Sequence, residues 1–171
     1  MSVINEPTNK NFLSPLGFSF SVKRLPTVNF FVTRVTIPGV SLGVAETPTP
    51  FITIPRPGRL QFSELQVTFK VDEDMLNYKE IYGWMTALGR VDGFESYSSI
   101  AAAEKTSGNG IYSDGVLGIL TSAMNPNILV TFANMFPVSI SDLEFNSQAA
   151  DVEYLEATAT FRFQSFKLEN A

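Results

Sequence analysis

The sequence predicts a mainly β fold, an antiparallel β-sandwich or barrel with one α-helix packed on the sheet. Several segments alternate apolar and polar side chains, turn residues separate them, and only one stretch repeats its apolar residues at helical spacing. The chain has 171 residues, of which 44% are hydrophobic and 17% charged. This composition is typical of a globular protein, and we expect a single domain over residues 1–171.

The N-terminal part predicts an arm and a hairpin. Residues 1–16 are polar at the start and carry no secretion signal, so we expect an N-terminal arm. Residues 17–24 alternate apolar and polar side chains, which indicates a half-buried strand. After a turn at 25–28, residues 29–37 are rich in β-branched and aromatic side chains. We expect this run to return as the antiparallel partner of the first strand.

A proline-rich excursion follows over residues 38–59. Its prolines provide no amide proton for a β-ladder and lie at Pro38, Pro48, Pro50, Pro55 and Pro57. We therefore expect an excursion or edge segment with little regular structure. Long loops of this kind usually have a function.

Residues 60–71 predict a strand whose pattern is interrupted. The apolar side chains change parity near Ser63 and Glu64. Because side chains of a strand alternate strictly between its two faces, this change indicates a bulge or a turn between two strands.

Residues 72–89 predict the helix. Apolar side chains repeat at helical spacing, and the candidates for its core-facing stripe are Ile81, Trp84, Met85 and Leu88. Acidic residues at 72–74 stand in the expected first turn, where they stabilise the helix dipole. This role as helix caps is favoured over a metal site made of the same carboxylates.

The C-terminal half predicts an insertion and three strands. Residues 90–115 are rich in Gly, Ser and Asp and are expected to form a flexible insertion with a helical turn at 100–105. Residues 116–123 and 127–132 predict a hairpin, which Pro137 then interrupts. Residues 151–168 predict a long strand with one polar face and a bulge at Ser165.

The composition excludes most catalytic chemistry. The chain has no His and no Cys, so it has no disulfide, no imidazole base and no zinc site built from these residues. We therefore expect no enzyme activity, no catalytic residue, no metal and no cofactor. A net charge of −5 disfavours a groove that binds nucleic acid, and the fifteen Phe residues are better explained as core than as stacking platforms. No apolar stretch approaches the ~20 residues that span a membrane, so we expect a soluble, cytoplasmic product.

Several motifs in order along the chain carry a family resemblance. They are TIPG at 36–39, VDED at 71–74, the Trp84 helix, MFP at 135–137 and SISDLEF at 139–145, followed by the final alternating strand. In this order, over residues 17–168, the chain resembles the tail tube proteins of contractile-tailed bacteriophages. The insertion at 91–114 and the prolines at 48–57 depart from the family pattern.

The resemblance implies a structural virion protein, located in the virion tail and made and assembled in the host cytoplasm. Its subunits would close into six-membered rings in which the sheets join into one barrel, and the rings would stack into a tube through which DNA passes without specific binding. Tail sheath and baseplate proteins are the implied partners, and no membrane is involved. The arm and the excursion are candidates for stacking contacts, because such contacts need segments that become ordered on association.

Two polar strand faces are candidates for the channel wall. Sliding DNA requires a surface with few cations, and each face has both an acidic and a basic member. Without the resemblance, both would be interpreted as ordinary solvated faces of an antiparallel sheet. The candidates are Glu64, Gln66, Thr68 and Lys70 on one strand, and Glu156, Thr158, Thr160, Arg162 and Gln164 on the other.

Two alternatives stay open. A protein of the same fold could form a ring in the baseplate or at a tube end. A monomeric ligand-binding β-barrel would also suit a strand-rich chain with many Phe residues.

Overall fold

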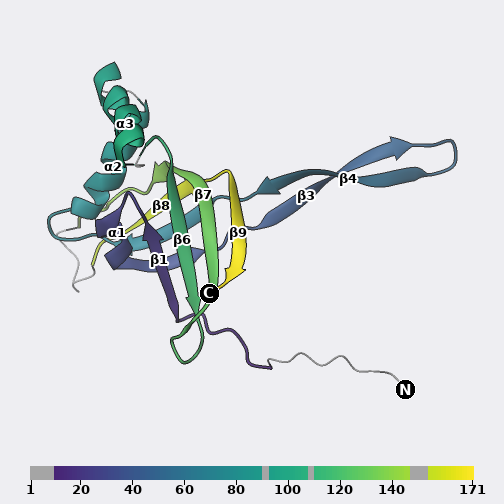
Figure 1. The fold of residues 1–171 in the computed structure, drawn as a ribbon, viewed down its shortest axis with the longest axis horizontal. Coiled ribbons are helices and arrows are strands. Elements are labelled where there is room, and N and C mark those ends of the chain that lie inside the picture. The colour runs from purple at the N-terminus through teal and green to yellow at the C-terminus, as the bar shows by residue number, and fades with distance from the viewer. Residues whose placement is uncertain (1–9, 90–92, 108–109, 147–153) are drawn as a thin grey trace.

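The computed structural model describes residues 10–89, 93–107, 110–146 and 154–171 (Figure 1). The predicted mainly antiparallel β fold is confirmed. Residues 1–9 of the expected arm and 151–153 of the expected last strand lie outside the described residues, as do 90–92 and 108–109 of the expected insertion.

The strands are β1 (Phe18–Val22), β2 (Val32–Thr36), β3 (Val40–Pro48), β4 (Thr53–Phe62), β5 (Leu65–Lys70), β6 (Ser113–Leu120), β7 (Pro126–Ile140), β8 (Glu156–Arg162) and β9 (Ser165–Asn170). The helices are α1 (Pro26–Phe31), α2 (Leu76–Gly89) and α3 (Phe94–Ser107).

Seven strands form one sheet in the order β1-β6-β7-β8-β5-β2, and β9 pairs with β7 beside this path. The long strand β7 belongs to both halves of the sheet. Its first part pairs with β6 and β9, and its second part pairs with β8. Between these parts the backbone bends at Asn134, whose φ is 54°, and the register shifts between Pro137 and Ser139. The expected interruption at Pro137 is therefore wrong, because a bulge accommodates the proline within the strand.

The predicted hairpin between residues 17–24 and 29–37 is also wrong. β1 pairs with β6, β2 pairs with β5, and the short helix α1 separates β1 from β2. Pro26 begins α1, a position where proline favours a helix. The Asn29 side chain accepts a hydrogen bond from the Val22 amide (2.8 Å) and donates one to the Val22 carbonyl (3.1 Å), which ties α1 to the end of β1.

The other helices differ from expectation in position and in number. α2 begins at Leu76, so the acidic residues at 72–74 precede the helix and do not occupy its first turn. The expected flexible insertion contains a full helix, α3, because a run of good helix formers lies at 101–105. In Figure 1, α3 extends away from the sheet beyond α2.

The proline-rich excursion forms a two-stranded hairpin, β3–β4, that projects far from the sheet in Figure 1. The segment is an edge segment, as expected, but it has regular structure: among the described strands β3 and β4 pair only with each other, and proline fits an edge strand. Gly58 lies against Gly43 at a register shift, where a Cβ on Gly58 would stand 2.8 Å from the Gly43 carbonyl oxygen. The parity change predicted near Ser63 and Glu64 is the turn between β4 and β5.

The C-terminal strands largely follow the sequence pattern. β6 and β7 form the predicted hairpin across residues 121–125. The last alternating segment forms β8 and β9, which run in the same direction along β7, with Arg162 opposite Phe136 and Ser165 opposite Ala133. The change of parity at Ser165 is therefore a local irregularity in one continuing strand direction, which fits the expected bulge. The polar-out, apolar-in alternation of β8 holds, since Ala157, Ala159 and Phe161 are buried.

The core lies between the curved sheet and helices α1 and α2. Its largest fully buried side chains include Trp84, Phe69, Phe132 and Phe161. None of the helices within the described residues is long and apolar enough to cross a membrane.

Candidate channel face and assembly surfaces

The two predicted polar faces form one continuous surface, because β5 and β8 are antiparallel neighbours. In this register Gln66 stands opposite Thr160, Thr68 opposite Thr158, and Lys70 opposite Glu156. The apolar residues between them, such as Val67 and Ala159, point to the core and are fully buried. We call the exposed side of these two strands the polar face.

Its polar groups are paired with one another across the strands. The hydroxyl oxygens of Thr68 and Thr158 lie 3.1 Å apart, within hydrogen-bonding distance. The Arg162 Nε donates to the Glu64 carboxylate at 3.0 Å, although the two residues are 98 positions apart in sequence. The charges on this surface are therefore arranged as neighbours of opposite sign, which leaves few cations for a phosphate.

The remaining predicted face residues lie at its margins. Glu64 precedes β5, and Gln164 lies in the short break between β8 and β9. The Gln164 side-chain oxygen accepts a hydrogen bond from the side-chain nitrogen Nδ2 of Asn134 at 2.5 Å, so Gln164 is tied to the bend of β7. Lys70 lies at the opposite margin, with its Nζ 5.3 Å from the centroid of the Tyr154 ring.

Strands β2 and β7 widen the polar face beyond the predicted residues. Arg34 stands opposite Thr68 across β2 and β5, and Ser139 stands opposite Thr160 across β7 and β8. The Ser141 hydroxyl accepts a hydrogen bond from the Thr158 amide at 2.9 Å. The alternation within β2 could have indicated Arg34, but only the pairing with β5 assigns it to this face.

The helix-core candidates lie on the other side of the sheet. Ile81 and Trp84 are buried, whereas Met85 and Leu88 are half-buried. The Trp84 ring centroid lies 6.5 Å from that of Phe161, so α2 covers the apolar side of β8. Within the described part of the chain, α2 therefore lies on the side of β8 opposite the polar face.

Sequence reasoning missed Asn77, which is fully buried in α2. Its side-chain amide donates to the Lys70 carbonyl at 2.7 Å, and its own backbone amide donates to the Asp72 carboxylate at 3.2 Å. Asp72 thus satisfies an amide in the first turn of α2 from outside the helix. Among the described residues, no group of three or more His, Cys, Asp or Glu side chains could hold a metal ion.

Three strands of the seven-stranded sheet pair on one side only among the described residues. Among the described strands, β1 pairs only with β6, β2 only with β5, and β9 only with β7. Soluble proteins usually protect such edges, because the free backbone groups can pair with another chain. β1 and β2 stand at opposite ends of the strand order, so an edge-to-edge contact between copies would be head-to-tail.

The β3–β4 hairpin exposes an apolar face. Val40, Leu42, Val44 and Leu60 share one side of the ribbon by register, and all four are exposed. At the tip, Phe51 is 94% exposed, although the turn around it is ordered by hydrogen bonds between Thr49 and Ile52. At the base of the hairpin, the ring centroids of Phe62 and Phe166 lie 5.5 Å apart, and this contact attaches the hairpin to the seven-stranded sheet.

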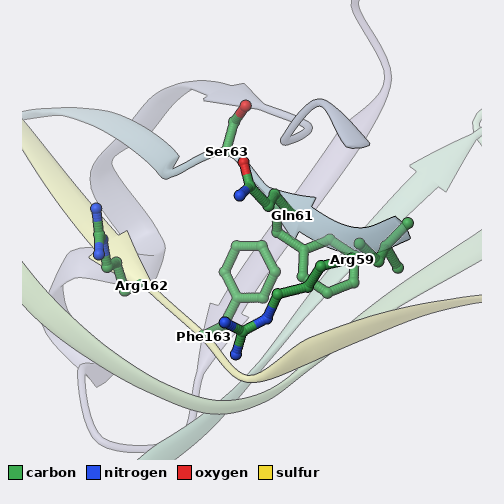
Figure 2. Close-up of a pocket in the computed structure, with 7 residues that line it drawn as sticks. Arg59, Gln61, Ser63, Arg162 and Phe163 are labelled. Atoms are coloured by element: carbon green, nitrogen blue, oxygen red, sulfur yellow. The ribbon is translucent and has the colours of Figure 1, made fainter. Parts of the chain in front are cut away.

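A pocket of about 440 Å³ lies at this base, shown in Figure 2. The close-up shows polar side chains around aromatic rings: Arg59, Gln61 and Ser63 come from the hairpin and the turn after it, while Arg162 and Phe163 come from the end of β8. Leu60 and Phe62 complete the lining. Among the described residues, no carboxylate forms an ion pair with Arg59.

Comparison with known proteins identifies the family. The model of the phage tail tube protein family matches residues 4–169, which is nearly the whole chain. The chain belongs to the phage tail tube protein family. Comparison with curated proteins gives no match.

Solved structures of contractile assemblies share the tube-family fold. The tube-terminating cap of the anti-feeding prophage is 13% identical, with a TM-score of 0.69, and all of both chains is covered. The sheath-tube complex of an extracellular contractile injection system contains a chain that is 13% identical, with a TM-score of 0.65, over 95% of this chain and 94% of that chain. A chain from the sheath/tube terminator of the same system is 16% identical, with a TM-score of 0.64, over 94% and 99%.

The family assignment fits the surfaces described above. A tube-family subunit is a structural component of a contractile tail, and its solved neighbours are parts of tubes, caps and terminators. Unpaired strand edges and an exposed apolar hairpin are expected of a protein that assembles, because an isolated protein gains nothing from exposing them.

Proposed function

We propose that this tube-family protein is the tail tube subunit. Copies close into six-membered rings, the rings stack, and the polar face lines a channel for DNA. In this proposal the protein acts in the virion tail after assembly in the host cytoplasm, contacts the sheath and the baseplate, and catalyses no reaction.

The observation that carries the proposal is the set of one-sided strands. β1 and β2 terminate the strand order, and each lacks a partner on its outer side among the described strands. Pairing the β2 edge of one copy with a free edge of the next would satisfy both rows of backbone groups, and closure of the ring would leave neither of these two edges open. Six is the number of subunits that the family resemblance implies.

The polar face supports a channel wall. In a closed barrel one side of the sheet faces inward. The polar face can take this position, because α2 packs on the opposite side of the sheet. Its hydroxyls and amides offer DNA little specific affinity, and the ion pair between Glu64 and Arg162 neutralises one cation. DNA could thus pass along the wall without being held.

Negative-stain microscopy of concentrated protein tests the assembly. Rings or tubes are the expected result, and lengthening of the tubes with concentration would show stacking. Uniformly small particles at every concentration would refute the proposal and favour a monomeric ligand-binding β-barrel.

A second function, a ring at the tube end or in the baseplate, is favoured by one comparison. The match to the tube-terminating cap covers all of both chains. The copy number per virion separates the two functions: a tube subunit is among the most abundant virion proteins, whereas an end protein is present as a single ring.

A further inference from the structure

The pocket at the base of the hairpin has the chemistry of a site for an acidic segment with an apolar neighbour. Its lining includes two aromatic rings, Phe62 and Phe163, which we call the aromatic floor, and the arginine side chains of Arg59 and Arg162. Arg162 is already bonded to Glu64, whereas Arg59 has no ion-pair partner among the described residues. The pocket can therefore accept at least one further carboxylate.

The turn between β5 and α2 has the complementary chemistry. Its backbone is closed by a hydrogen bond from the Met75 amide to the Asp72 carbonyl at 2.9 Å, and Met75 has a φ of 55°. Glu73 and Asp74 are exposed on this turn, and Leu76 beside them is an exposed apolar residue. We call residues 72–76 the acidic turn.

The pocket and the acidic turn lie at opposite ends of strand β5. At the pocket end Leu65 pairs with Phe161, and at the other end Lys70 pairs with Glu156, just before the acidic turn. Six residues of strand span roughly 20 Å, so a chain cannot place its acidic turn in its own pocket. A second copy can do so.

We propose that the pocket around Arg59 receives the acidic turn of a second copy, with Glu73 or Asp74 at the Arg59 guanidinium and Leu76 against the aromatic floor. The contact joins the two ends of a strand, whereas the free edges lie along its sides. Because the strand edges are assigned to contacts within a ring, the contact between strand ends is the contact between stacked rings. This inference rests on the proposed tube function. Because the two surfaces differ, the contact is head-to-tail and can repeat without limit along the tube.

Charge reversal tests this contact. We expect Arg59→Glu to raise the protein concentration for half-maximal tube formation by at least about tenfold, because the contact repeats around the ring and like charges would face each other at every copy. Combining Arg59→Glu with Glu73→Lys and Asp74→Lys restores opposite charges and should recover tubes. Arg56→Glu is the matched control, since it makes the same change three positions away and outside the pocket lining.

Cysteine cross-linking gives a second readout that does not depend on the charge effect. The chain has no cysteine, so the double variant Arg59→Cys and Glu73→Cys contains only the two test thiols. Oxidation of assembled protein should give a ladder of linked subunits on a non-reducing gel. The pair Arg56→Cys and Glu73→Cys should give none, because a disulfide forms only between Cα atoms within about 7 Å.

The outcomes separate this inference from the proposed function. Two results would overturn the inference and leave the tube function intact. One is that Arg59→Glu forms tubes as well as the wild type does. The other is that the double cysteine variant forms normal tubes but gives no ladder of linked subunits on oxidation. Single rings that no longer stack in Arg59→Glu, and stack again in the swapped variant, would support both. A wild-type protein that forms neither rings nor tubes would overturn both.

Discussion

Truncation of Trp84 should cost the subunit a large part of its stability. The side chain is 2% exposed, its Nε1 donates to the Ile111 carbonyl at 3.3 Å, and its ring packs on Phe161. Replacing a large buried aromatic residue with Ala costs about 3–5 kcal/mol, and loss of the hydrogen bond adds about 1 kcal/mol. Since a domain of this kind has about 5–15 kcal/mol in total, Trp84→Ala should lose at least about a quarter of the stability of the subunit.

The Arg24 side chain adds to the cost of this substitution. Its guanidinium carbon lies 5.0 Å from the centroid of the Trp84 ring, and its Nη1 donates to the Gly110 carbonyl at 2.7 Å. Burial lowers the pKa of Arg24, which indicates that the guanidinium has lost part of its hydration. Removal of the ring would leave this cation without its aromatic contact.

Urea denaturation followed by circular dichroism measures the effect, at protein concentrations low enough to prevent assembly. Circular dichroism is required because Trp84 is the only tryptophan of the chain and its fluorescence is lost in the variant. Trp84→Phe should lose about 1–2 kcal/mol, since the ring packing is largely kept. Tyr82→Ala, an exposed aromatic residue on the same helix, is the control and should change stability by less than about 1 kcal/mol. A loss below about 1 kcal/mol for Trp84→Ala would refute the packing of α2 on the sheet.

Three further predictions concern assembly. Thr68→Lys combined with Thr160→Lys should slow DNA ejection in a virion assay, because new cations on the channel wall bind phosphate; an unchanged rate would contradict the placement of the polar face in the channel. Gly58→Ala should prevent stacking without lowering the urea midpoint, because the added Cβ would stand 2.8 Å from the Gly43 carbonyl oxygen and distort only the exposed hairpin; normal tubes would show that the hairpin is not needed. Deletion of residues 1–15 should leave the urea midpoint unchanged and shorten the tubes seen by electron microscopy, whereas loss of folding would show that the arm belongs to the core.

The sequence predicted the features that depend on local pattern. Alternation in 17–24 and in 151–168 predicted strands with one buried face, and helical spacing predicted the Trp84 helix. The parity change near Ser63 predicted the turn between β4 and β5. In β1, α2 and β8 the local pattern and the packing agree, because the apolar side of each element is the side that faces the core.

Pairing partners could not be predicted in the same way. The hairpin expected between residues 17–24 and 29–37 is replaced by pairs of β1 with β6 and of β2 with β5. These pairs join distant segments, and no local pattern encodes them. For the same reason the sequence predicted two separate polar faces, and only the β5–β8 register shows that they are one.

The prolines indicated an irregular excursion at β3–β4 and an interruption of β7, whereas both segments form regular strands. A proline blocks a hydrogen bond only where a neighbouring strand would need it, and β3 and β4 have no outer neighbours among the described strands. The pocket around Arg59 was missed because residues 59–63 meet Arg162 and Phe163 only in the folded protein. A site made by distant segments leaves no motif in the sequence.

Folding and assembly use different parts of this molecule. The buried side chains lie between the sheet and helices α1 and α2, whereas the free edges, the hairpin and the acidic turn lie outside that core. A subunit can therefore fold before it meets another copy, and its assembly surfaces can change without loss of the fold. In the proposed assembly the lateral edges would join copies along the sides of strands and the pocket would join them at the ends of strands, so ring closure and ring stacking would be physically separate steps. Variants at Arg59 should consequently arrest assembly at rings, and variants that block the edge of β2 should arrest it at folded monomers.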